Sequence, residues 1–296
     1  MSVDIRKVLK YPPEAFLSAL PVDLVVGSNK VAEYVGFDPY VLVIQGLSFS
    51  RTVGVRFTMN VDGYTDVVRL DDLASVKGLD YEEDVKVVTT KIATMLITSP
   101  SAITGFPWRH RVTAFRPTVA MKLQLGMRLT PDEEELATRY DVRTLLMLEV
   151  PKPFNLSYGI EEWRAVSVRL TSSGTVMRVS VPKDKKIILA GIAVERPPAP
   201  ASAYLNVVRD NVDVLHLDLY CLPGLEYVAP VRIVSTDSIE ANLDVRTAGE
   251  YKVRLVYGIG RLTITEKVMW RLDLTTAERT LAETQNLFEK VLVGVL

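Results

Sequence analysis

"LTPDEEELATRY" (residues 129–140) and "LTTAERTLAETQ" (residues 274–285) both open with Leu-Thr, carry a glutamate three residues after the threonine, and continue with Leu-Ala. Laid over each other without a gap at an offset of 145, residues 116–150 and 261–295 share nine identical pairs among 35 positions. Ordinary residue frequencies give about two. The nine pairs are Arg116/Arg261, Thr118/Thr263, Lys122/Lys267, Leu129/Leu274, Thr130/Thr275, Glu133/Glu278, Leu136/Leu281, Ala137/Ala282 and Val150/Val295. The sequence therefore predicts two copies of one unit, with domains at residues 1–150 and 151–296.

The match continues toward the amino terminus of each copy. "VLVIQGLSFSR" (residues 41–51) faces "KIILAGIAVER" (residues 186–196), with a glycine at the same place in each. "GLDYEEDVKVVTT" (residues 78–90) faces "GLEYVAPVRIVST" (residues 224–236). One or two single-residue gaps are enough, so an internal duplication explains the whole chain most economically.

A shorter motif occurs three times, as "DIRKVL" (residues 4–9), "DVRTLL" (residues 141–146) and "NLFEKV" (residues 286–291). Equivalent helices at both termini would each leave an apolar face for another subunit in head-to-tail contact. The alternative is a chance match of short Asp-capped helices that fold back on their own domain. The assembly interface predicted on the first interpretation consists of Ile5, Val8, Leu9, Leu287, Val291 and Leu292.

Capping signals predict helices at the end of each copy. Thr130 with Glu133, and Thr275 with Glu278, have the spacing of a capping box, in which each side chain binds the other residue's backbone amide. Pro131 at the first helical position supports the start in the first copy. Short helices are expected near residues 118–125, 131–139 and 142–149 and at the same places in the second copy.

Elsewhere the hydrophobic pattern has a period of two. Turn residues recur every 8–12 positions without alternating helices, which is typical of antiparallel sandwiches and jelly rolls. Asp62-Gly63 and Asp210-Asn211 are expected to form equivalent hairpin turns. The clearest strands are expected at residues 166–171, 176–181, 212–220, 239–245 and 251–258. The predicted fold is mainly β: two tandem antiparallel β-sandwich, jelly-roll-like domains from an internal duplication, each followed by a short helical segment.

Composition describes a well-packed globular chain. It has 296 residues, 48% hydrophobic and 24% charged, and a net charge of −1, which argues against nucleic acid as a partner. The single cysteine, Cys221, rules out an internal disulfide. Neither a signal peptide nor a membrane span is found, so synthesis in the cytoplasm without membrane association is expected. Only three glutamines hint at a thermophilic source.

Motifs for chemistry are missing. His110 and His216 do not occupy equivalent positions and no Cys/His cluster has ligand spacing, so neither a metal nor a cofactor is expected. No nucleophile elbow or phosphate loop is found. A glycan-active enzyme with paired carboxylates on its strands stays an open alternative, because 36 acidic residues are too many for the sequence to single out a pair.

Two groups of residues are candidate ligand sites. Trp108, Arg109 and Arg111 lie in the basic, aromatic stretch "WRHRVTAFR", which could follow a phosphate backbone or could be a strand whose arginines face water. Tyr81 and Tyr227 lie in the matching loops "GLDY" and "GLEY". These tyrosines have either a sugar-binding role or a packing role that the fold requires in both copies.

With tandem sandwiches, capped helical ends and no catalytic motif, the chain resembles virion structural proteins, such as phage or archaeal-virus capsid, tail or decoration subunits. The resemblance implies a non-enzymatic subunit that self-assembles or docks on a particle, with copies of itself or other virion proteins as partners. A carbohydrate-binding or adhesion module is the first alternative. A glycan-active enzyme is the second.

Overall fold

The computed structural model describes residues 4–144 and 160–294. The chain forms two compact units, which divide it differently from the predicted copies. Met1–Phe115 with Glu162–Ile259 form the first, here called the sandwich unit, and residues 116–161 with 260–296 form the second, the helical unit. The predicted copy boundary at residues 150 and 151 lies outside the described residues, so it stays a prediction. In the described ranges, no helix has the length and apolar character needed to cross a membrane.

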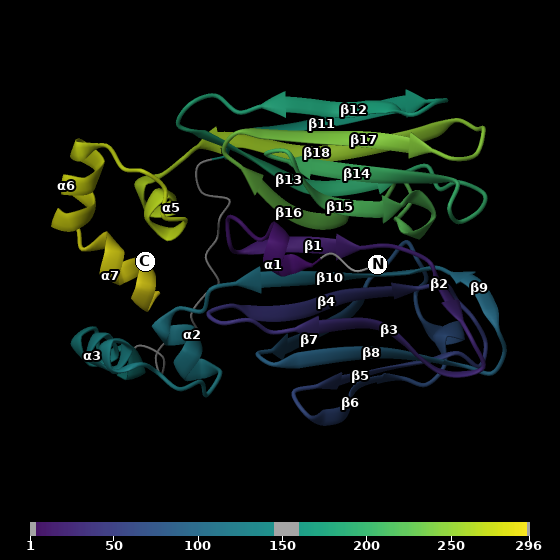
Figure 1. The fold of residues 1–296 in the computed structure, drawn as a ribbon, viewed down its shortest axis with the longest axis horizontal. Helices are drawn as coiled ribbons and strands as arrows, with labels where there is room; N and C mark the ends of the chain where they lie inside the picture. Colours follow the sequence, from purple (N-terminus) through teal and green to yellow (C-terminus); the bar gives the residue numbers. More distant parts are fainter. Residues whose placement is uncertain (1–3, 145–159, 295–296) are drawn as a thin grey trace. The chain divides into compact units, whose positions relative to one another are not determined.

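The first half of the sandwich unit contains a short helix and ten strands (Figure 1). In chain order these are α1 (Ile5–Val8), β1 (Glu14–Ser18), β2 (Val22–Leu24), β3 (Gly27–Val35), β4 (Val41–Phe49), β5 (Arg56–Val61), β6 (Tyr64–Leu70), β7 (Glu83–Thr89), β8 (Ile92–Ser99), β9 (Ile103–Phe106) and β10 (Trp108–Phe115), with a 3-10 turn η1 (Leu73–Ser75) after β6. β2 and β9 form a small sheet of their own.

The second half contains eight strands. They are β11 (Ile160–Leu170), β12 (Gly174–Ser180), β13 (Lys185–Val194), β14 (Ala203–Arg209), β15 (Val212–Asp218), β16 (Ala229–Ser235), β17 (Ser238–Val245) and β18 (Tyr251–Arg261), with η2 (Leu219–Cys221) after β15. All five strands predicted here from the sequence are present, with ends shifted by a few residues.

Both halves have the same strand order. The first has the sheets β1-β10-β4-β7 and β3-β8-β5-β6, and the second has β11-β18-β13-β16 and β12-β17-β14-β15. When the eight main strands of each half are counted in chain order, both sandwiches have sheets 1-8-3-6 and 2-7-4-5, the order of an eight-stranded jelly roll. The prediction of two mainly β, antiparallel, jelly-roll-like sandwiches is therefore confirmed.

The matching glycines Gly46 and Gly191 have a common steric cause. Each lies at a bulge, where the register shifts against the neighbouring strand, β7 in the first jelly roll and β16 in the second. A Cβ at Gly46 would collide with the carboxylate of Glu82, and a Cβ at Gly191 with the side chain of Val228. A close approach at the same bulge of both sheets therefore requires glycine.

Equivalent aspartates hold the tight hairpin turns. Asp62 and Gly63 between β5 and β6, and Asp210 and Asn211 between β14 and β15, all have positive φ, as a type I′ turn requires. The Asp62 carboxylate accepts hydrogen bonds from the backbone amides of the neighbouring β7–β8 turn, including Ile92 N at 2.8 Å. The Asp210 carboxylate likewise accepts a hydrogen bond from Ser238 N at 3.1 Å. Each aspartate thus forms part of one hairpin turn and binds the backbone of a neighbouring turn.

This arrangement makes stability depend on pH. Burial opposes ionisation of Asp62, but the hydrogen bonds from Ile92, Thr89, Thr90 and Lys91 outweigh it and lower the pKa of the carboxyl. A lowered folded-state pKa gives stability that is complete above the unfolded value of about 3.9 and is lost as the pH falls through the folded value. Asp62→Asn keeps a residue that tolerates positive φ but removes the charge. We expect urea unfolding between pH 7 and 2 to show a lower stability at pH 7, by about 1–3 kcal/mol, and a shallower acid decline. If stability falls equally steeply with decreasing pH in the wild type and in Asp62→Asn, the proposed contribution of the Asp62 carboxylate is wrong.

The helical unit combines the ends of both predicted copies. Its helices are α2 (Val119–Gln124), α3 (Pro131–Arg139), α5 (Ile264–Met269), α6 (Thr276–Thr284) and α7 (Leu287–Val293), and residues 142–144 begin a further helix. The expected helix near residues 142–149 lies mostly outside the described residues. The buried cluster of the unit draws on α2, α3 and α7, with Val119, Leu136 and Val293 among its members.

The capping boxes predicted at Thr130 and Thr275 are confirmed. In both, the cap glutamate also forms an ion pair: Lys122 Nζ lies 2.7 Å from Glu133 Oε1, and Lys267 Nζ lies 2.8 Å from Glu278 Oε1. Three of the nine identities between the copies, Lys122/Lys267, Thr130/Thr275 and Glu133/Glu278, thus have one structural explanation.

Thr130→Ala and Thr275→Ala are each expected to lower the unfolding free energy by about 0.5–2 kcal/mol, because each removes the side chain that accepts from the third helical amide. Thr276→Ala is the matched control, since this exposed neighbour is the first residue of α6 and not its cap. Thermal melts in which the control and the cap variants shift equally would rule out the capping explanation.

Candidate interaction surface

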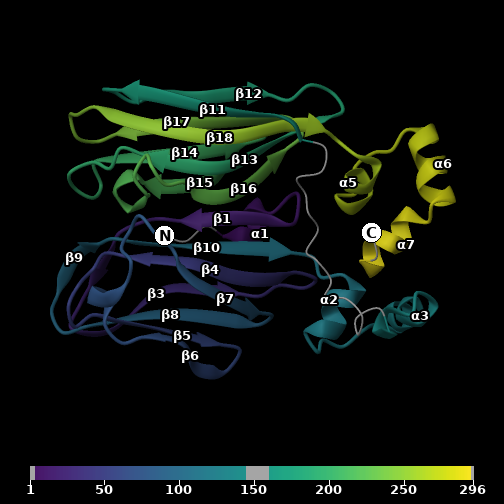
Figure 2. The ribbon, with the colours of Figure 1, turned by 180° about the vertical axis from the view of Figure 1, so that it is seen from behind.

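The two jelly rolls join through the edges of their sheets. β1 of the first pairs antiparallel with β16 of the second, with Ala15 opposite Arg232. The result is one sheet of eight strands in the order β11-β18-β13-β16-β1-β10-β4-β7, seen in Figure 1 and from behind in Figure 2. We call the contact between β1 and β16, with the side chains around it, the joint.

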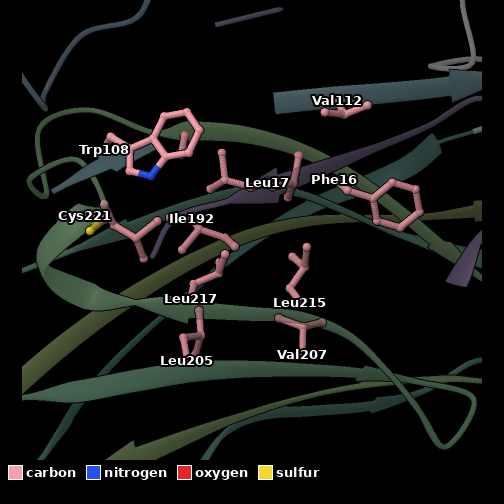
Figure 3. Close-up of a cluster of buried hydrophobic side chains, with 14 of the residues drawn as sticks. Phe16, Leu17, Trp108, Val112, Ile192, Leu205, Val207, Leu215, Leu217 and Cys221 are labelled. Carbon is pink, nitrogen blue, oxygen red and sulfur yellow. The ribbon is translucent and has the colours of Figure 1, made fainter. Parts of the chain in front are cut away.

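Apolar side chains from both jelly rolls share one core at the joint. Phe16 and Leu17 of β1 are 3% and 1% exposed, and they lie in the same cluster as Leu215 and Leu217 of β15. Figure 3 shows these side chains with Trp108 and Val112 of the first jelly roll and Ile192, Leu205, Val207 and Cys221 of the second. Because burial removes apolar surface from water, the joint is part of the hydrophobic core.

A buried ion pair crosses the joint. Glu14 of β1 and Arg209 of β14 bind each other, with side chains 0% and 3% exposed. Glu14 also accepts hydrogen bonds from the backbone amides of Tyr11 at 3.0 Å and Val234 at 3.2 Å, and Arg209 donates to the carbonyl of Val8. The charges of this pair are thus compensated on both sides, as burial demands.

The two matching loops meet at one end of the joint. Asp80 Oδ1 of "GLDY" accepts from Gly224 N of "GLEY" at 2.9 Å and from Arg196 Nη2 at 2.7 Å. The hydroxyls of Tyr81 and Tyr227 lie 2.7 Å apart, with ring centroids at 4.8 Å and planes tilted by 55°. The hydrogen bond to Tyr81 raises the pKa of Tyr227. The structure therefore brings the two predicted tyrosines into direct contact.

Arg109 binds both jelly rolls at this end of the joint. Its guanidinium donates to the carbonyls of Leu79 and Cys221, one from each jelly roll. Burial lowers its pKa to about 10, with nearby Glu82 opposing the change, so it stays protonated at neutral pH. Burial also raises the pKa of Glu82, against the influence of Arg111, whose guanidinium lies 3.4 Å from this carboxylate. The Arg109 guanidinium thus links the loop of residues 78–81 to Cys221 of the second jelly roll.

Most of the basic, aromatic stretch is inaccessible. Trp108 and Arg109 are 3% and 1% exposed, and the Arg111 side chain is 17% exposed. For Arg109 both interpretations are corrected: its side chain neither faces water nor offers a surface to nucleic acid, because it is buried and binds the carbonyl of Leu79. Of the candidate ligand residues, Tyr81 is the one with a large exposed fraction, 46%.

The predicted interface of the terminal helices is also corrected. Ile5 and Val8 of α1 are buried in the core of the sandwich unit, and Leu9 packs against it. In α7, Leu287 is buried, Val291 is half-buried and Leu292 packs on the helical cluster. For Ile5, Val8 and Leu287 the expectation of an uncovered face is wrong, because each helix folds back on its own unit. Leu9, Val291 and Leu292 are half-buried, and a role for them in assembly stays a prediction.

His110 and Cys221 are buried ionisable side chains of the sandwich unit. His110 stacks on Trp108, with ring centroids 4.5 Å apart, and its Nε2 lies 2.6 Å from the Tyr34 hydroxyl. Burial lowers the pKa of His110 to about 3 and raises that of the Cys221 thiol to about 12, so both are neutral at physiological pH. Within residues 4–144 and 160–294, no three His, Cys, Asp or Glu side chains are grouped to hold a metal ion.

Sequence reasoning missed Glu14 and Arg209, the buried ion pair that crosses the joint. One signal was available at Arg209. It directly precedes the turn aspartate Asp210, whereas Val61 precedes the equivalent Asp62. A charge where the other copy has an apolar residue marks a place where the two copies have different neighbours.

No protein-family model matches the chain, and no curated protein matches it. Among solved structures, it is similar to the CUB1-EGF-CUB2 region of human MASP-1/3, with 8% identity over 83% of this chain and 99% of that one, at a TM-score of 0.28. It is also similar to the tandem CBM51 modules of a family 98 glycoside hydrolase from Streptococcus pneumoniae, with 10% identity over 80% and 83% of the two chains, at a TM-score of 0.25. A third is the triple jelly roll of an archaeal-virus turret, with 10% identity over 83% of this chain and 59% of that one, at a TM-score of 0.27. At these scores the likeness is one of β-rich architecture and assigns neither an activity nor a partner.

Proposed function

We propose that this chain is a non-enzymatic structural subunit that assembles into, or docks on, a larger particle, and that the particle is a virion. The observation that carries the proposal is the joint, where two jelly rolls fuse edge to edge into one sheet. The buried charges at the joint bind protein groups of both jelly rolls. Glu14 pairs with Arg209, and Arg109 donates to backbone carbonyls. A chain built this way is suited to extending surfaces rather than to enclosing a substrate.

The proposal is tested by measuring mass and shape across concentrations. Sedimentation velocity and light scattering of the purified chain should show oligomers that grow with concentration, and negative-stain electron microscopy should show regular particles or arrays. A chain that stays monomeric at every concentration and is missing from purified virions of its source would overturn the proposal.

A carbohydrate-binding role is the second candidate, and the exposed Tyr81 beside Tyr227 favours it. The two rings are tilted by 55°, so they do not form the flat platform on which a sugar usually stacks. A glycan array with the chain and its Tyr81→Ala variant decides the point: binding that Tyr81→Ala abolishes would support this candidate, and no binding would exclude it.

Catalysis on glycans through paired strand carboxylates is the third candidate. Three buried or half-buried carboxylates of the sandwich unit have structural partners: Glu14 binds Arg209, Glu82 lies beside Arg111, and Asp218 accepts from two backbone amides. Hydrolysis of reporter glycosides, lost when a strand carboxylate is replaced by its amide, would be required to revive this candidate.

A further inference from the structure

Within the described residues, each strand at the joint has a counterpart at an edge of the same eight-stranded sheet that pairs with no further strand. β1 lies at the joint, and its counterpart β11 is the first strand of the sheet; β16 lies at the joint, and its counterpart β7 is the last. The joint is therefore a head-to-tail contact between two similar bodies. Such a contact leaves one unsatisfied edge of each kind at the two ends.

Burial differs between each strand and its counterpart as this arrangement requires. Four of the five residues of β1 are buried, whereas none of the eleven residues of β11 is. Five residues of β16 are buried, against two of β7. β15, which lies beside β1 at the joint, has four buried residues, and its counterpart β6 has none.

The exposed edges carry features of a contact surface. β11 is eleven residues long, although free edges in monomeric proteins are usually short or covered. Trp163 on β11 is 55% exposed, and Tyr64 on β6 is 75% exposed. Exposed aromatic side chains are the commonest anchors of protein interfaces.

We propose that β7 of one chain pairs antiparallel with β11 of a second copy, repeating between chains the β16–β1 joint found within each chain. The sheet would then continue from chain to chain, and a heterologous contact of this kind closes into a ring or extends as a filament. Asp84 and Lys86 on β7 and Glu162 and Arg164 on β11 give both edges charges of both signs, so the edges do not repel each other. This inference rests on the proposed structural function and names its partner, a second copy.

The experiment uses cysteines on the outward face of each edge. Lys86 is the counterpart of Arg232, which faces β1 at the joint. Val166, Val168 and Leu170 pack inward, so alternate positions Trp163, Ala165 and Ser167 face outward. Three double variants of the full chain each carry Lys86→Cys together with Trp163→Cys, Ala165→Cys or Ser167→Cys. Each is treated with a short bis-maleimide. Cys221 is retained because it is buried.

The expected result is a ladder of cross-linked dimers, trimers and larger species for at least one of the three double variants. Each single-cysteine variant should give no ladder, because a head-to-tail contact never brings two identical positions together. Cross-links that join Lys86→Cys to itself would overturn the proposal, and so would the failure of all three double variants.

Trp163→Asp gives an independent measurement. It should raise the protein concentration needed for self-association at least about tenfold, as loss of an aromatic anchor does. Val53→Asp is the matched control, because Val53 is 79% exposed in the β4–β5 loop and lies on neither edge. If Trp163→Asp forms the same oligomers as the wild type and the double-cysteine variants give no cross-linked ladder, the edge contact is wrong. The proposed structural function would not be affected by that result. A full-length chain that never associates would remove both self-assembly and this inference.

Discussion

Replacing Arg209 by alanine is expected to lower the unfolding free energy of the sandwich unit by about 3–5 kcal/mol, the usual cost of leaving one member of a buried ion pair alone. The Glu14 side chain is fully buried, so without Arg209 its charge has no route to water. The backbone carbonyls of Val8 and Val234 lose a donor at the same time. The loss should appear as a lower urea midpoint at pH 7.

The controls separate the ion pair from a general loss of charge. Arg178→Ala removes an exposed arginine, paired with Glu240 on the second jelly roll, and should change stability by about 0–1 kcal/mol. The double variant Glu14→Gln with Arg209→Met should recover part of the loss, because it leaves no uncompensated charge in the joint. If Arg209→Ala melts as Arg178→Ala does, the joint is not held by this pair.

Local patterns made the two jelly rolls predictable. The hairpin turns at Asp62 and Asp210, the period-two strands and the capping boxes at Thr130 and Thr275 are each encoded within a few neighbouring residues. The duplication then repeats the evidence, so a signal that is weak in one copy is supported by the other. The fold class follows from signals of this kind.

The joint could not be predicted in the same way. Glu14 and Arg209 are 195 positions apart, and the partner of each comes from the other jelly roll. Arg109 shows the same difficulty, because alternation places it on the outer face of β10 and the sequence does not reveal the loop that covers it. Contacts between two copies leave no periodic pattern within either copy. At Arg209 the contact is marked in the sequence by a difference between the copies, because the equivalent residue is Val61.

The terminal helices show the same dependence on tertiary structure. Their apolar residues are real, and a helix with an apolar face needs a partner. The partner of α1 is the core below β15, and α7 packs among α2, α3, α5 and α6. Which surface covers a helix depends on tertiary structure, so the amphipathic pattern alone does not distinguish a partner in another chain from one in the same chain.

Phe16→Ala is expected to lower the unfolding free energy by about 3–5 kcal/mol, the range for removing a buried phenylalanine side chain. Phe16 is 3% exposed in β1, where it faces the core shared by the two jelly rolls (Figure 3). Because Leu215 and Leu217 of the second jelly roll line the same core, the cavity opens to both sandwiches. Val53→Ala, at a site 79% exposed, should be close to neutral.

The effect of Phe16→Ala is expected to extend into both jelly rolls. Hydrogen exchange should become faster in β10, which pairs with β1, and also in β15 and β16, although these strands are about 200 residues from the substitution in the chain. Two jelly rolls that merely share a linker would confine the effect to the first. A shared core requires that both jelly rolls lose protection from hydrogen exchange and that the sandwich unit unfolds in one cooperative transition. Faster exchange limited to β1, β4 and β10 would show that the eight-stranded sheet consists of two independently stable halves.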